Sequence, residues 1–125
     1  MTNIDYNQVR TSRYLSGIRF AQVQEELRRR AHRLNFVRAE ILADPAWDIL
    51  LTAYAFELVQ RQPTASELSD RMNVPSTTAM RWLKVLEAEG LLERRVVAAD
   101  RAEVMVSLTL RGIEAMDGYF AGIPD

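Results

Sequence analysis

Hydrophobic positions in the first third of the chain recur at alternating steps of three and four residues. This spacing runs from about Ile18 to about Ala43 and predicts one long amphipathic helix, because an α-helix places such positions on one side. The positions that carry the pattern are Phe20, Val23, Leu27, Ala31, Leu34, Val37 and Ile41. The first dozen or so residues are polar, and we expect them to be flexible.

Two short signals mark the helices that follow. Asp44 and Pro45 indicate a start, since Asp can accept hydrogen bonds from free N–H groups and Pro suits the first helical position. This second helix is expected to reach about Arg61, and apolar residues on nearly all of its sides predict that it is central and buried. Thr64, followed three residues later by Glu67, forms a capping box that predicts another helix.

The third and fourth helices are joined by a tight turn. The third is expected over about 65–72, and Asn73 then suits the left-handed backbone that often ends a helix. Pro75 blocks continuation and favours a new start, and the fourth helix is expected to run to Glu89, where Gly90 ends it. Two helices joined by so short a turn predict a helix-turn-helix.

After this glycine the hydrophobic period changes from helical to alternating, in the stretch "LLERRVVAADRAEVMVSLTL". The pattern predicts a β-hairpin over about 92–108 with the polar turn "AADRAE". A last helix is expected from about Leu110, capped by Thr109. The predicted fold class is therefore mainly α with a small β-hairpin wing: a winged helix-turn-helix domain with a long N-terminal helix.

Composition narrows the class of protein. The chain has 125 residues, of which 48% are hydrophobic and 26% charged, as expected for one globular domain. No stretch approaches the roughly 18 apolar residues of a membrane span, and the N-terminus lacks a signal sequence, so we expect a cytoplasmic protein with no membrane partner. The net charge is −1, yet residues 1–40 carry eight Arg against four acidic residues and residues 71–101 carry six basic residues against four acidic ones. Basic segments of this kind are where nucleic acid would bind.

Catalytic chemistry is not indicated. The chain has no cysteine, which excludes disulfides and thiolate metal sites, and its one histidine, His32, lies in a run of arginines. The carboxylates are scattered, and there is no glycine-rich loop for phosphates and no set of residues for a nucleophilic triad. We expect no enzyme activity, no cofactor and no metal.

The fourth helix has two sides of different character. The apolar side carries Ala79, Trp82, Leu83 and Leu86. The outer side lies about 200° around the helix axis from the apolar side, at 3.6 residues per turn. It carries Thr77, Met80, Arg81 and Lys84, with Ser76 at the N-terminal end.

Such an outer side suits the major groove of DNA. Arg81 could bridge guanine O6 and N7, and Thr77 and Met80 could contact a thymine methyl. Ser76 and Lys84 could hold phosphates, Ser76 with the help of the helix dipole. The alternative interpretation is a solvated helix side whose Ser and Thr only cap its first turn.

Arginines of the hairpin are further candidates for DNA contacts. Arg101, at the tip, could enter a narrow minor groove; alternatively it is a solvent-exposed turn residue paired with Asp100. Arg94 and Arg95 could reach the DNA backbone, but alternation places them on opposite faces of their strand, so at most one is expected to do so.

From Asp44 to about Phe120 the chain resembles the MarR family of bacterial transcriptional regulators. The resemblance lies in "ASELSDRMNVPSTTAMRWLKVLEAEGLLER", in the turn "AADRAEV" and in "SLTLRG". It implies a homodimeric repressor or activator that binds double-stranded DNA at a palindromic operator, with the recognition helix (about 75–89) in the major groove and the wing (about 92–108) near the minor groove. It assigns DNA contacts to the matching positions Ser76, Thr77, Met80, Arg81, Lys84 and Arg101.

The chain departs from the family pattern in two ways. The wing reads Asp100-Arg101-Ala102 and lacks the second arginine that often follows, which weakens the prediction of minor-groove binding. Family members commonly dimerise with a further C-terminal helix, whereas this sequence ends at Asp125.

We therefore expect dimerisation through the N-terminal helix, supported by the C-terminal one. Phe20, Leu27, Leu34 and Ile41 stand seven residues apart, as in a seam between helices, although the same stripe could pack on its own domain. We expect the stripe both to form the seam of the dimer and to pack on its own domain. The chain then divides into a flexible N-terminus with a dimerisation helix (1–43), a DNA-binding core (44–109) and a supporting C-terminal helix (110–125).

Two further interpretations stay open. The resemblance implies a small aromatic effector bound between the dimerisation region and the DNA-binding part, and Tyr14, Phe36, Trp47 and Tyr54 could line that cleft, although they suffice equally as core. The alternative function is a winged-helix module, an adaptor or anti-regulator, that binds protein instead of specific DNA. The acidic overall balance and the incomplete wing favour it, whereas Arg81 and Lys84 disfavour it.

Overall fold

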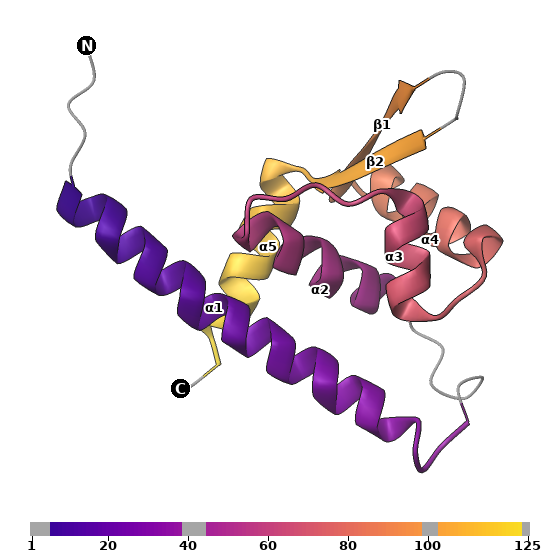
Figure 1. Ribbon diagram of the computed structural model, residues 1–125, viewed down its shortest axis with the longest axis horizontal. Coiled ribbons are helices and arrows are strands. Elements are labelled where there is room, and N and C mark those ends of the chain that lie inside the picture. The colour runs from indigo at the N-terminus through magenta and orange to yellow at the C-terminus, as the bar shows by residue number, and fades with distance from the viewer. Residues whose placement is uncertain (1–5, 39–44, 99–102, 124–125) are drawn as a thin grey trace.

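The computed structural model describes residues 6–38, 45–98 and 103–123 of the chain. In order they form α1 (Tyr6–Arg33), α2 (Pro45–Leu58), α3 (Ala65–Met72), α4 (Ser76–Ala88), β1 (Leu92–Ala98), β2 (Glu103–Leu108) and α5 (Leu110–Ala121). The long helix α1 runs along one edge of the molecule, and the hairpin projects from the opposite side of the remaining helices (Figure 1). The predicted fold class is confirmed. Over the described residues no helix combines the length and the apolar character needed to cross a membrane.

The long helix differs from its prediction at both ends. It begins at Tyr6 instead of near Ile18, and it ends at Arg33 instead of near Ala43. Beyond Arg33 the chain turns tightly, since the N–H of Asn35 bonds the carbonyl of His32 at 3.1 Å. The apolar spacing continues past this turn, but its side chains there meet no core: Phe36 is 75% exposed. The spacing therefore predicted the helix but not its ends.

Helix α2 is the central, buried helix that its composition predicts. Its fully buried residues include Ile49, Leu51 and Tyr54. The helix ends at Leu58, short of the expected Arg61, because the backbone takes a left-handed conformation at Gln60, where φ is 56°. The predicted Asp44 cap lies outside the described residues.

The helix-turn-helix forms where its local signals predict it. The hydroxyl of Thr64 accepts a hydrogen bond from the N–H of Glu67 at 3.0 Å and caps α3. Asn73 takes the left-handed conformation, with φ of 55°, and the chain restarts as α4 one residue after Pro75. Gly90 follows α4 with φ of +77°, a backbone angle that glycine adopts without strain.

The hairpin is antiparallel, with Leu92 opposite Leu108. Strand β2 is also joined to the segment before α3, because the N–H of Val106 donates to the carbonyl of Pro63 at 2.9 Å. Thr109 then caps α5 through Gly112, as predicted, at 3.1 Å. A side chain at Gly112 would meet the Leu91 carbonyl oxygen at 2.2 Å, so the close approach of α5 to the residue before β1 requires glycine.

The seven-residue seam of α1 packs on its own domain. Phe20 and Leu27 are half-buried against the core, and Leu34, beyond the helix end, is 53% exposed. Ile41 lies outside the described residues. Two of the three described seam residues, Phe20 and Leu27, are thus used within the chain.

Candidate nucleic-acid interface

The two sides of α4 have the contrast that its sequence predicts. Ala79 and Leu83 are 2% and 0% exposed and fix the helix to the core. On the other side Ser76, Thr77, Arg81 and Lys84 are exposed. The guanidinium carbon of Arg81 lies 5.9 Å from the centre of the Trp82 ring, so this arginine runs beside the ring of its neighbour while remaining open to solvent.

Met80 is placed differently from its prediction. It is half-buried against the core, and its sulfur accepts a hydrogen bond from Arg94 Nη1 at 3.2 Å. Strand β1 passes along this edge of α4 and covers a position that would face solvent on an isolated helix. Met80 therefore connects α4 to the wing and lies at the edge of the exposed outer side of α4.

Arg94 and Arg95 point to different surroundings, as alternation along β1 predicts. Arg94 makes a two-pronged contact with Glu87, from Nη2 to Oε1 at 3.0 Å and from Nε to Oε2 at 3.1 Å. These hydrogen bonds raise the pKa of Arg94 and lower the pKa of Glu87. Arg95 is exposed and donates to Gln62 Oε1 at 3.2 Å. Of the two, Arg95 is the one that solvent and ligands can reach.

The tip of the wing carries the last predicted DNA contact. Arg101 and the adjoining Asp100 lie outside the described residues. The contact of Arg101 with a minor groove thus stays a prediction, as do the DNA contacts of the α4 residues.

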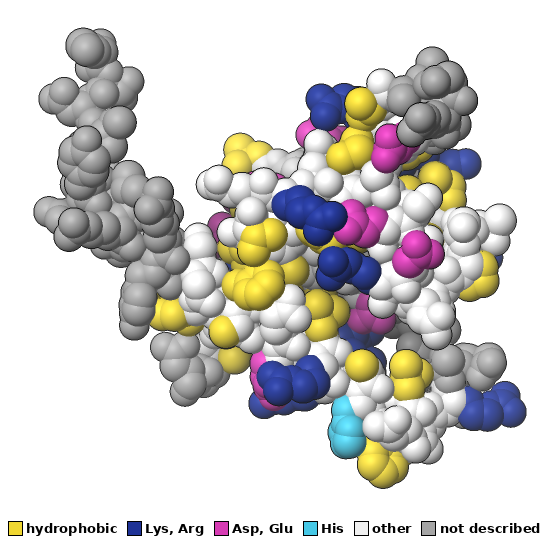
Figure 2. Space-filling view, in the orientation of Figure 1, with side chains coloured by type: hydrophobic (Ala, Val, Ile, Leu, Met, Phe, Trp, Pro, Cys, Tyr) yellow, Lys and Arg dark blue, Asp and Glu magenta, His cyan; other side chains and the backbone are white. Residues whose placement is uncertain are grey.

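The face of the molecule over α1, α2 and α3 has a different electrostatic character. Basic and acidic side chains are interspersed on it, without a single-sign patch (Figure 2). Arg61 and Arg71 both pair with Glu67, at 2.7 and 3.9 Å. A surface that mixes charges in this way is a poor match for the uniform charge of a phosphate backbone.

Of the four aromatic residues considered for an effector cleft, the three whose side chains are described do not meet in one. Tyr54 is 1% exposed and stacks on Phe120, with ring centres 5.7 Å apart. Trp47 contacts Tyr119 edge to face, and Phe36 lies at the exposed turn after α1. The side chain of Tyr14 lies outside the described residues.

A groove of about 810 Å³ lies instead between α1 and the helices α2 and α3. Its apolar wall includes Phe20, Leu27 and Phe56, and its basic side chains include Arg28, Arg33 and Arg71. Among the described aromatic residues considered above, neither Phe36 nor Trp47 nor Tyr54 lines it. The groove combines apolar surface with positive charge, which suits a small anionic molecule with an apolar part.

A polar cluster between α1, α2 and α5 was not predicted from the sequence. Glu26 Oε1 accepts hydrogen bonds from Trp47 Nε1 at 2.9 Å and from the Tyr119 hydroxyl at 3.1 Å. One turn further along α1, Arg30 pairs with Asp48. Burial raises the pKa of the Tyr119 hydroxyl and the bond to Glu26 raises it further, so the hydroxyl remains a donor. The sequence offered only a general signal, that the polar atoms of Trp and Tyr seek partners when buried.

A helix-turn-helix followed directly by a two-stranded wing defines a winged-helix protein. The model of the MarR family matches residues 42–103, which include α2, α3, α4 and β1. No curated protein sequence matches the chain. The winged-helix part of the chain thus matches the MarR family.

Solved structures with the same fold cover most of the chain. A protein from Ralstonia eutropha is 26% identical with a TM-score of 0.55, over 62% of this chain and 96% of that one. Staphylococcus aureus MepR, solved as a complex with DNA, is 21% identical with a TM-score of 0.55, over 82% of this chain and 79% of its own. Escherichia coli MarR in its apo form is 18% identical with a TM-score of 0.50, over 94% and 75%.

Proposed function

We propose that this chain is a DNA-binding transcriptional regulator of the MarR type, which binds a palindromic operator as a homodimer. The observation that carries the proposal is the division of α4 into a buried apolar side and an exposed side with hydroxyl and basic groups, next to a wing. The MepR structure with DNA supports it, because that protein has the same fold.

In this proposal the exposed side of α4 enters the major groove. Arg81 reads guanine, Thr77 contacts a thymine methyl, and Ser76 and Lys84 hold phosphates. Met80 contacts DNA only with the part of its side chain that remains exposed, since Arg94 holds its sulfur toward the wing. Arg95 is the wing-strand arginine placed to reach the DNA backbone, and Arg101 remains the proposed minor-groove contact.

The proposed homodimer brings two copies of α4 into successive major grooves. Exposed apolar residues in the N-terminal half of α1, on α5 and just beyond α5 supply surface for it: Leu15 is 51%, Tyr119 42% and Ile123 37% exposed. Dimers of this kind bind half-sites about one helical turn, roughly 10 base pairs, apart. The groove between α1 and α2 is the proposed site for a small aromatic acid, since arginines line it.

The test is selection of bound sequences from a random duplex library, followed by titration of the winner at several salt concentrations. We expect an inverted repeat, bound with a steep salt dependence because phosphate contacts release counterions. Arg81→Glu should reduce affinity for the selected site by about tenfold or more, since a bidentate contact to guanine contributes about 1–3 kcal/mol.

Arg29→Glu is the matched control. It makes the same charge change on α1, where Arg29 is exposed and pairs only with Glu25 among the described residues. It should leave the selected sequence unchanged. Failure to enrich any sequence, with weak binding that disappears at modest salt, would reject the proposal and favour a protein-binding module.

A further inference from the structure

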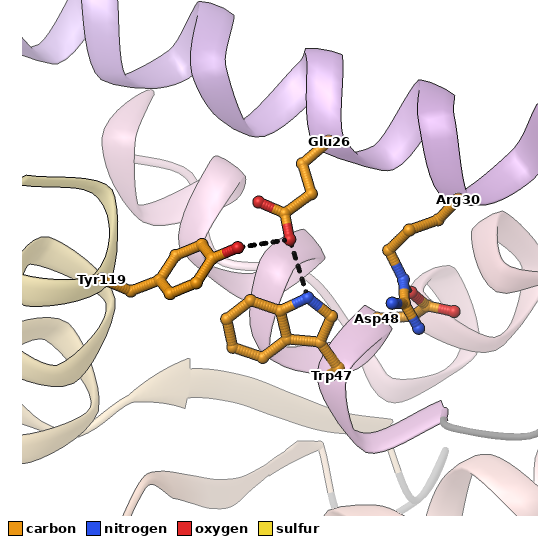
Figure 3. Close-up of polar contacts among 5 residues, drawn as sticks. All are labelled: Glu26, Arg30, Trp47, Asp48 and Tyr119. Carbon is orange, nitrogen blue, oxygen red and sulfur yellow. Dashed lines mark hydrogen bonds and ion pairs between the residues drawn. The ribbon is translucent and has the colours of Figure 1, made fainter. Parts of the chain in front are cut away.

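The polar cluster on α1 (Figure 3) fixes that helix to two others at one point. A single carboxylate oxygen, Glu26 Oε1, accepts from Trp47 Nε1 of α2 and from the Tyr119 hydroxyl of α5. The rings of Trp47 and Tyr119 contact each other edge to face, with centres 4.9 Å apart. Glu26 therefore links α1 to both helices at once.

Two more polar contacts lie on the same side of α1. Arg30, one turn further along, pairs with Asp48 of α2 (Figure 3). Arg19, seven residues before Glu26, donates from Nη1 to the backbone carbonyl of Asp117 at 2.8 Å. Positions seven and four residues apart share one side of a helix. α1 is thus held by polar contacts at several points between Arg19 and Arg30.

Apolar packing along this interface is carried by a small number of α1 side chains. Over residues 15–33, where side chains of α1 are described, only Val23 is fully buried, and Phe20 and Leu27 are half-buried. Apolar contacts are not directional and allow one helix to shift along another. Hydrogen bonds require a distance and an angle, so the polar contacts fix the direction of α1.

We propose that Glu26, with its donors Trp47 and Tyr119, acts as a positioning residue that sets the distance between the two recognition helices of the dimer, and so the operator spacing that the protein accepts. The inference rests on the proposed function, in which α1 and α5 form the dimer. α1 has 28 residues. Half the length of α1 is about 20 Å. If α1 rotates by about 10°, its end and the recognition helix attached to it move by about 3.5 Å, roughly one base-pair step.

The first readout does not involve DNA. The chain has no native cysteine, so Ala88→Cys, at an exposed position of α4, gives one spin label per chain, and pulsed electron spin resonance gives the distance between the two labels. We expect a narrow distance distribution with native Glu26. Glu26→Ala should broaden or shift it, whereas Glu26→Gln should keep it, because an amide oxygen still accepts from both donors.

Glu25→Ala is the matched control, since Glu25 pairs with Arg28 and Arg29 of its own helix among the described residues and not with α2 or α5. If Glu26→Ala does not fold, Tyr119→Phe removes one donor and keeps the ring. An unchanged distribution in the folded variant, or the absence of any distance between two chains, would overturn the inference.

The second readout uses the selected half-sites, placed in duplexes with spacers shortened or lengthened by one or two base pairs. With Glu26 we expect affinity to fall about tenfold for a change of one base pair; with Glu26→Ala the loss should shrink to about threefold or less. Affinity lowered equally at all spacings would indicate a structural role only and contradict the inference. If a narrow distance is found but no duplex is bound, the proposed function fails while the positioning role stands.

Discussion

The helices α4 and α1 are held in place by different kinds of contact. α4 is fixed by apolar side chains, among them Leu83 and Leu86, which are 0% and 5% exposed, and its outer side makes few contacts with the rest of the chain. α1 has one fully buried apolar side chain over residues 15–33, Val23, and is also held by charged and polar groups such as Glu26 and Arg30. Because α4 is anchored by its apolar side, residues on its outer side can be substituted without loss of the fold. The placement of α1 depends on particular polar partners.

The largest expected effect comes from removing an anchor of α4. Leu83→Ala should lower the free energy of unfolding by about 2–5 kcal/mol, because it leaves a cavity in the core. Arg81→Ala, on the outer side of the same helix, should change it by about 0.5 kcal/mol or less. Urea unfolding of both variants tests this contrast. A similar loss in the two would mean that the outer side also supports the fold.

The next effect concerns α5, which contacts α1 through Tyr119 and lies against Leu91, the residue before β1. Gly112→Ala should cost about 1–3 kcal/mol, since the new methyl group would press on the backbone oxygen of Leu91. Gly118→Ala, in the same helix with open space around it, should be neutral or stabilise by up to about 1 kcal/mol. Thermal unfolding followed by circular dichroism gives both values. Equal effects would show that α5 can move away from the wing.

A smaller effect is expected on α1. Glu26→Ala leaves two donors without their acceptor and should cost about 1–2 kcal/mol. Glu25→Ala removes only exposed ion pairs, which contribute about 0–1 kcal/mol. Chemical unfolding of the two single variants compares them directly. If Glu25→Ala proved the more costly, the polar anchoring of α1 would be refuted.

The smallest effect is the pH dependence of the contact between α4 and β1. Arg94 lowers the pKa of Glu87 below its ordinary value of 4.5. A carboxylate whose pKa is lower in the folded state stabilises the fold above the ordinary pKa, and this contribution is lost as the pH falls through the folded value. The stability difference between the native chain and Glu87→Gln should therefore shrink below about pH 4. A difference independent of pH would contradict the pairing.

Local signals allowed the core of this fold to be predicted from the sequence. Thr64 and Thr109 cap α3 and α5 through residues three positions away, so each short stretch contains its own start signal. The extent of α1 could not be predicted in this way. Its N-terminal turns carry no hydrophobic pattern, and the pattern continues past the actual end at Arg33.

The candidate DNA-binding site could likewise be predicted only in part from the sequence. The exposed side of α4 follows from helical spacing alone. The half-buried position of Met80 depends on Arg94, and the Glu26 cluster joins residues 21 and 93 positions apart. Spacing within one helix carries no information about partners that other elements bring to it.

The joining of β2 to the segment before α3 has a consequence for self-association. A two-stranded sheet has two open edges, and open edges allow strands of other chains to add to the sheet and aggregate. Here Pro63 accepts from Val106 and Thr64 pairs with Met105, so part of the β2 edge is closed. Charged residues occupy three consecutive positions of β1, Glu93, Arg94 and Arg95. The wing thus projects from the molecule with part of one edge closed and with charged residues along the other strand, which reduces the edge open to other chains.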